Sequence, residues 1–313
     1  MHLIPPRISL FRSSSWAALW LAAALVGCGA PATEEDVSLG RSAEGLVSTN
    51  GLSTNGLSTN GLSTNGLSTN GLSTNGLSTN GLSTNGFQTW FTQDPALADM
   101  VMRYVVQCSM AAGATLSYQS PAGTNYTWHG SLGLAPGWAG GQPATLAEQQ
   151  VVSACLAAHA NKYGVHVNIS VLGRDAVGGE MPYSTDELNT YAEREACFFG
   201  NLFTGEGTFA ANDGAYLSYD ESTVRTCGLS SWSETTTCAP MKHVGACRYY
   251  CTLDATRTYY TRCKYNGVNY RPITTRMLPQ DIYRCGDGVC QLTEKCGTGN
   301  TPDSCAADCG ACN

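Results

Sequence analysis

The chain has 313 residues, of which 13% are charged, and its net charge is -7. Proteins that bind nucleic acid usually carry a positive charge, so this composition argues against a nucleic-acid partner. The chain also contains 15 cysteines. Cysteines in this number are typical of secreted proteins, which form disulfides in an oxidising compartment.

The first residues have the pattern of a bacterial secretion signal. Arg7 and Arg12 precede an apolar run from Trp16 to Leu25, which is far shorter than the roughly 20 residues that a membrane-spanning helix needs. The run ends in Leu25-Val26-Gly27-Cys28, the pattern of a lipobox. We therefore predict a cleaved lipoprotein signal peptide over residues 1–27.

Lipid attachment at Cys28 follows from this assignment, and residues 28–44 are then the lipidated N-terminal segment. The acyl chains would anchor the protein to a membrane. Because Gly29 stands where inner-membrane lipoproteins often carry Asp, we expect the outer membrane or the cell surface. The alternative is an ordinary signal peptide in which Cys28 has no role.

A repeat fills residues 45–86. After GLVSTN, the pentapeptide GLSTN occurs seven times from Gly51 to Asn85. Chains rich in Gly, Ser, Thr and Asn form flexible linkers, so we predict a tether that holds the rest of the protein away from the membrane. The alternative is a pentapeptide solenoid with leucines such as Leu52 and Leu57 pointing inwards.

Three helices are expected in the core domain, residues 87–284. Asp94 and Pro95 are a helix start, and Gly113 can end that helix. The pairs Thr145/Glu148 and Ser184/Glu187 have the spacing of capping boxes. We expect the third helix to run through Cys197 towards Gly200, so that each helix carries one cysteine.

Strands should complete an α+β core. Hydrophobic residues alternate over residues 165–171, which predicts a strand with one buried face. Weaker patterns cover residues 115–118 and 126–128. The strongest pattern is a hairpin of residues 259–265 and 268–273 around Asn266-Gly267, a dipeptide that suits a two-residue turn.

The cysteines divide into two even groups once Cys28 is assigned to the lipid. Each group can pair within itself, and sequence alone does not choose among the pairings. Eight lie in the core, and six lie in residues 285–313, where no apolar core exists to hold the segment without disulfides. The disulfide-forming residues are Cys108, Cys155, Cys197, Cys227, Cys238, Cys247, Cys251 and Cys263 in the core, and Cys285, Cys290, Cys296, Cys305, Cys309 and Cys312 in the tail.

The tail has the form CGDGxC, then Glu, then Cys, then DCGxC. It resembles small cysteine-rich modules on secreted and surface proteins of myxobacteria. Together with the lipobox and the Asn-Gly-Leu repeat, it is similar to a family of myxobacterial lipoproteins. This resemblance implies surface display and brings no particular activity with it.

Asp287, Glu294 and Asp308 stand at recurrent positions of this module and offer the oxygen ligands that Ca²⁺ prefers. Calcium is the one cofactor that the sequence suggests. The alternative is that Asp287 and Asp308 cap turns through their side chains.

Hydrolytic motifs are weak. Ser131 lacks the glycine two residues earlier that a nucleophile elbow needs. Acidic residues such as Asp175 and Glu180, or Glu193 and Glu195, could supply the two carboxylates of a glycosidase, but capping or solvated roles are the alternative. His159 is expected in the core.

The hairpin carries the most informative surface. We expect Tyr260, Arg262, Lys264 and Arg271 to share one face, with Arg262 opposite Arg271. Like charges in such a position either project into water or bind an anion. We therefore predict a non-enzymatic surface protein that binds acidic polysaccharide of the envelope or matrix. The alternatives are an extracellular hydrolase acting on polysaccharide or peptide, and a structural spacer.

Overall fold

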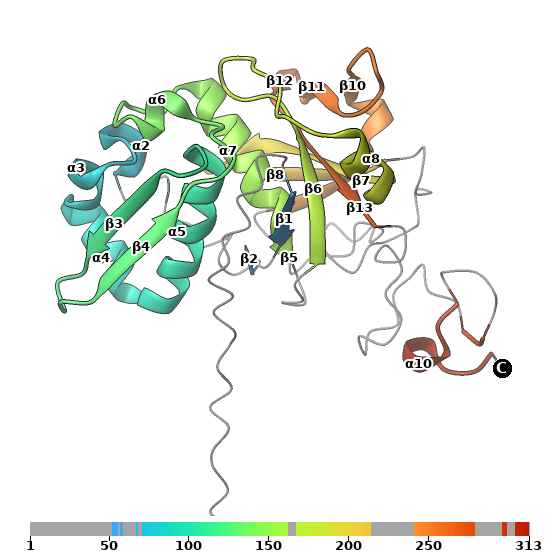
Figure 1. The fold of residues 1–313 in the computed structure, drawn as a ribbon, viewed down its shortest axis with the longest axis horizontal. Coiled ribbons are helices and arrows are strands. Elements are labelled where there is room, and N and C mark those ends of the chain that lie inside the picture. The colour runs from blue at the N-terminus through green and yellow to red at the C-terminus, as the bar shows by residue number, and fades with distance from the viewer. Residues whose placement is uncertain are drawn as a thin grey trace, which may run out of the picture. The chain divides into compact units, whose positions relative to one another are not determined.

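The structure is a computed structural model (Figure 1). Cys28 and the rest of the predicted signal lie outside the described residues. Within the described part, helices and strands occur together, which confirms the α+β class, and no helix there is long and apolar enough to cross a bilayer. The structure describes residues 52–55, 57–58, 67, 71–161, 167–213, 241–278, 296–298 and 304–312.

A six-stranded sheet forms the centre of the fold (Figure 1). Neighbouring strands are antiparallel, except for the last pair, which is parallel. In spatial order the strands are β1 (Leu52–Asn55), β6 (Val167–Gly173), β13 (Ile273–Met277), β7 (Glu193–Asn201), β8 (Gly207–Asn212) and β9 (Met241–Ala246).

Strand β7 explains why the sheet is the middle layer. Ala196 and Phe198 point into one hydrophobic core, whereas Cys197 and Phe199 point into a second core on the other face. Because successive side chains of a strand alternate between faces, the segment can fill both cores only as a strand.

The third predicted helix is therefore wrong over most of its length. Ser184 does cap a helix by accepting a hydrogen bond from the Glu187 amide, but this helix, α8 (Thr185–Thr190), has six residues. The carboxylate of Glu187 accepts a hydrogen bond from Ser170 at 2.8 Å instead of closing a capping box. Strand β6 also differs from the prediction, since residues 169–172 are buried on both faces.

Helices cover one face of the sheet. Helix α5 (Pro95–Ser109) begins at the predicted Asp94 cap, and α7 (Leu146–Ala158) begins with the predicted capping box of Thr145 and Glu148. The Cys108–Cys155 disulfide joins the two helices. Next to them lie α4 (Asn85–Gln93), α6 (Pro136–Ala139) and a hairpin of β3 (Thr115–Gln119) and β4 (Asn125–His129), which confirms the two weaker strand predictions.

A three-stranded sheet covers the opposite face and contributes to the second core. Its turn at Asn266-Gly267 is the predicted one, with Tyr265 opposite Val268. Two disulfides hold this layer, Cys197–Cys247 and Cys251–Cys263. Its elements are η1 (Cys247–Tyr249), β10 (Cys251–Leu253), β11 (Tyr260–Tyr265) and β12 (Val268–Tyr270).

The second half of the repeat corrects the tether prediction, because it belongs to the folded core. Leu67, Leu72, Leu77 and Leu82 are all at most 2% exposed. Two short helices form here, α2 (Leu72–Asn75) and α3 (Thr79–Leu82). Further back, β1 pairs with β6, and β2 (Leu57–Ser58) pairs with β5 (Ala160–Asn161).

Hydrogen bonds fix the repeat to the core. The Trp138 indole donates to the Leu72 carbonyl at 2.7 Å, and the Leu77 amide donates to the Trp138 carbonyl at 2.9 Å. Gly76 has a φ of 77° and lies so close to Gly141 that an added Cβ would meet its backbone at 2.3 Å. The glycines of the repeat therefore allow close approach here as well as chain flexibility.

The disulfides of the described residues stay inside the two predicted groups. In the tail, Cys296 pairs with Cys312, and Cys305 and Cys309 are also disulfide-bonded around the short helix α10 (Ala306–Cys309). Cys227, Cys238, Cys285 and Cys290 lie outside the described residues.

Candidate functional site

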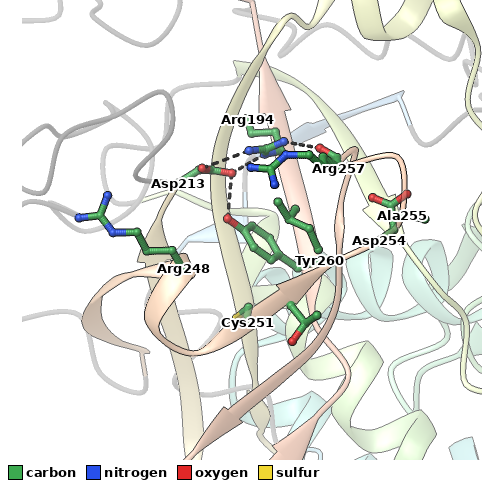
Figure 2. A pocket seen from close by; sticks show the side chains of 10 residues that line it. Arg194, Asp213, Arg248, Cys251, Asp254, Ala255, Arg257 and Tyr260 are labelled. Carbon is green, nitrogen blue, oxygen red and sulfur yellow. Dashed lines mark hydrogen bonds and ion pairs between the residues drawn. The ribbon is translucent and has the colours of Figure 1, made fainter.

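A pocket of about 690 Å³ opens between the three-stranded sheet and the part of the central sheet where β7 begins and β8 ends (Figure 2). It contains three arginines and two aspartates among its lining residues, so its charged groups sum to a net positive charge. The lining is Arg194, Asp213, Arg248, Cys251, Thr252, Leu253, Asp254, Ala255, Arg257 and Tyr260.

A buried ion pair forms one wall of the pocket. Arg194 of β7 contacts Asp213, which follows β8, and the two side chains are 4% and 2% exposed. Asp213 also accepts a hydrogen bond from the Tyr260 hydroxyl at 3.1 Å. Burial of this hydroxyl, together with the neighbouring Asp213 carboxylate, raises the pKa of Tyr260, so it stays a protonated donor. Figure 2 shows these three side chains joined by hydrogen bonds.

The same arginine supports the loop that presents Arg257. Arg194 donates a hydrogen bond from Nη1 to the Arg257 carbonyl, and Arg257 has a φ of 61°, in the left-handed region that non-glycine residues rarely adopt. The hydrogen bond from Arg194 thus helps to hold Arg257 in this strained backbone conformation.

Asp254 fixes the other end of this loop. Its Oδ1 accepts from the amides of Thr258 and Tyr259, and its Oδ2 accepts from the amide of Thr256. Burial acts to raise the pKa of Asp254, but the hydrogen bonds from the Thr256 side chain and from these amides outweigh it and lower the pKa. The carboxylate is therefore ionised and fully used as a turn acceptor.

Arg248 lines the pocket and contacts a tyrosine, Tyr249, that is not among the lining residues. The Arg248 guanidinium lies 5.1 Å from the centre of the Tyr249 ring and donates a hydrogen bond to its hydroxyl at 3.2 Å. Tyr249 is 66% exposed. Figure 2 shows Arg248 to one side of Tyr260 and Arg257 above it, next to Arg194, so that two arginines besides Arg194 line the pocket.

The predicted hairpin face does not assemble as expected. Arg262 and Lys264 are exposed on β11, and Lys264 lies opposite Asn269 as predicted. Tyr260, however, is 3% exposed and is no sugar platform. The pairing of β11 with β12 has the predicted register but ends at Tyr270, one residue before Arg271, which donates a hydrogen bond to the Asp175 carbonyl at 3.3 Å.

A β-bulge is the physical reason why Tyr260 is buried although Arg262, two residues later, is exposed. Arg262 pairs with Thr252 of β10, but the next pair is Tyr260 with Leu253, so the register shifts between them. A bulge turns a side chain from one face of a strand to the other. Tyr260 is thereby turned towards Asp213 in the second core.

The other predicted residues have structural positions. Asp175 accepts hydrogen bonds from the amides of Val177 and Gly179, and so caps a turn. Glu195 is fully buried and accepts a hydrogen bond from Thr275. His159 lies in the core, as predicted, against Cys155 and Tyr104.

The predicted calcium site stays a prediction, because only one of its three residues is described. Asp287 and Glu294 lie outside the described residues, and Asp308 is in α10, where it contacts the Cys305 sulfur at 3.3 Å.

Sequence reasoning missed the pocket because its residues are far apart in the chain. Arg194, Asp213, Arg248 and Arg257 share no motif or spacing. The one available signal was the segment of residues 247–251, CRYYC, in which an arginine and two tyrosines stand between cysteines that fix a short turn.

Comparison with known families identifies the repeat. A model of the GLTT repeat, with six copies, matches residues 45–73 and 66–89. The chain thus combines a GLTT-type repeat with a core and a disulfide-bonded, cysteine-rich tail. No curated protein and no solved structure matches it.

Proposed function

We propose that this protein is a lipid-anchored cell-surface protein that binds acidic glycans of the cell envelope or matrix in the pocket between Arg248 and Arg257. The observation that carries the proposal is that Arg248 and Arg257 line the same pocket, and that Arg248 contacts an exposed tyrosine, Tyr249. Guanidinium groups bind carboxylates and sulfates in a bidentate manner, and an aromatic ring offers a surface for a sugar.

The chemistry of the pocket favours binding over glycoside hydrolysis. A glycosidase needs one carboxylic acid that carries a proton. Both pocket carboxylates act instead as hydrogen-bond acceptors, Asp213 for Arg194 and Tyr260, and Asp254 for three amides of its loop. This supports a binding protein over the alternative hydrolase. A pocket lined by three arginines also favours a binding protein over a structural spacer.

The binding test compares two charge-matched variants. The full-length protein should be retained on an immobilised acidic polysaccharide. Arg248→Gln with Arg257→Gln should weaken retention by roughly 100-fold or more, since each of the two lost contacts to a charged group contributes about 1.5–3 kcal/mol. Salt should weaken wild-type retention, because the screening length falls from about 10 Å at 0.1 M to about 3 Å at 1 M.

Arg262→Gln with Lys264→Gln is the matched control. It removes the same charge from the exposed face of β11, outside the pocket, and should leave retention nearly unchanged. Equal losses in both variants would mean attraction to net charge without a site. A loss confined to the control variant would return the site to the hairpin face that the sequence predicted.

The anchor belongs to the same proposal and has its own test. The lipobox supports attachment at Cys28, and the resemblance to myxobacterial lipoproteins supports an outer-membrane or surface position. Cells fed a fatty-acid analogue should label the wild-type protein and not Cys28→Ser. Equal labelling of both proteins would contradict the lipid assignment.

A further inference from the structure

Two disulfides lie against each other beneath the pocket. The Cys197 sulfur of one bridge is 3.5 Å from the Cys251 sulfur of the other. The sulfurs of Cys197, Cys251 and Cys263 all lie within 4.8 Å of one another. A disulfide exchanges when a thiolate attacks one of its sulfurs. A thiolate formed on one bridge would therefore have the second bridge within reach.

Among the four cysteines of these two bridges, Cys251 is the one that lines the pocket. Cys197, Cys247 and Cys263 are fully buried, whereas Cys251 is half-buried and lines the pocket. Figure 2 shows Cys251 below Tyr260, and both residues line the pocket. Cys251 is thus the cysteine of the two bridges that a thiol entering the pocket would meet, and attack on its sulfur expels the sulfur of Cys263.

The charge of the pocket selects the attacking thiol. Arg248 and Arg257 line the approach to Cys251. A positive cleft raises the local concentration of anionic ligands, and positive groups favour the thiolate form that reacts. An anionic thiol should therefore react faster at Cys251 than a cationic thiol of similar intrinsic reactivity.

We propose that the Cys251–Cys263 bridge is a thiol-exchange site for a small anionic thiol, and that the exchange passes on to the Cys197–Cys247 bridge. The incoming thiolate bonds to the Cys251 sulfur, the Cys251–Cys263 bond breaks, and its electron pair leaves on Cys263 as a thiolate. Cys263 then attacks Cys197, which forms Cys197–Cys263 and releases Cys247 as a thiolate. Cys247 takes a proton from water and keeps its contact with the Ala211 carbonyl, 3.1 Å away. Each step breaks one disulfide and forms another, so no oxidant is consumed.

The inference uses the positive rim of the pocket but not a bound glycan, so its failure and the failure of glycan binding are distinct results. The test treats the full-length protein with glutathione as the anionic thiol and with cysteamine as the cationic thiol, at equal thiolate concentration. Acid quenching, alkylation and peptide mapping then locate the adduct and the free thiol.

We expect the adduct on Cys251 and the alkyl group on Cys247, with glutathione reacting roughly tenfold faster than cysteamine. Arg248→Gln with Arg257→Gln should remove that preference. The exposed Cys296–Cys312 bridge is an internal control and should react without this preference for glutathione.

Four results would overturn the proposal. An adduct on Cys263 or first reaction at Cys108–Cys155 would show that the pocket does not direct the attack. Equal rates for the two thiols in the wild type would remove the role of the arginines. Alkylation confined to Cys263 would overturn the transfer to the second bridge.

Discussion

Alanine in place of Leu72 or Leu77 is expected to lower the free energy of unfolding by about 2–5 kcal/mol for each substitution. Both leucines are at most 1% exposed and belong to the main hydrophobic core. Each substitution removes buried methyl groups and leaves a cavity, which a close-packed interior fills only in part. Urea denaturation of the full-length protein, followed by tryptophan fluorescence, measures the change.

Leu146→Ala is the matched control for these substitutions. Leu146 is 63% exposed at the start of α7, so its loss should change stability by no more than about 0.5 kcal/mol. If Leu72→Ala and Leu77→Ala resemble this control, the repeat is not packed against the core. The prediction of a flexible tether would then hold for its second half too.

The repeat shows why its structure was not predictable from sequence. The tetrapeptide LSTN forms strand β1 at Leu52–Asn55 and helix α2 at Leu72–Asn75. Local propensity is identical for the two copies, so tertiary contacts decide, and these contacts involve Trp138 and β6. The Gly, Ser, Thr and Asn content of the repeat predicts a flexible linker. Neither this composition nor the five-residue period shows which copies pack their leucine against the core.

Elements with strong local signals were predictable. Asp94-Pro95, the Thr145/Glu148 box and Asn266-Gly267 each satisfy specific backbone groups, so their structures follow from nearby residues. Residues 193–201 have no such signal, because their strand depends on partners in β13 and β8. The pocket was unpredictable for the same reason, since β7, β8 and the loop after β10 meet only in the folded chain.

Replacing Arg194 by methionine is expected to destabilise the protein by about 3–5 kcal/mol, because it removes the cation from a buried carboxylate. The Asp213 side chain is 2% exposed, and methionine keeps much of the volume of the arginine stem without its charge. Arg103→Met is the matched control. It breaks an ion pair with Asp99 at 3.2 Å in which Arg103 is 64% exposed, and such pairs contribute about 0–1 kcal/mol.

Arg194 also links stability to the proposed binding site. Without its hydrogen bond to the Arg257 carbonyl, the loop loses the contact that holds Arg257 in its left-handed conformation. Retention of Arg194→Met on acidic polysaccharide should therefore fall even at temperatures where circular dichroism shows a folded protein, whereas Arg103→Met should be retained like the wild type. A folded Arg194→Met protein with full retention would show that Arg257 needs no fixed position, and that the pocket binds through charge without a defined geometry.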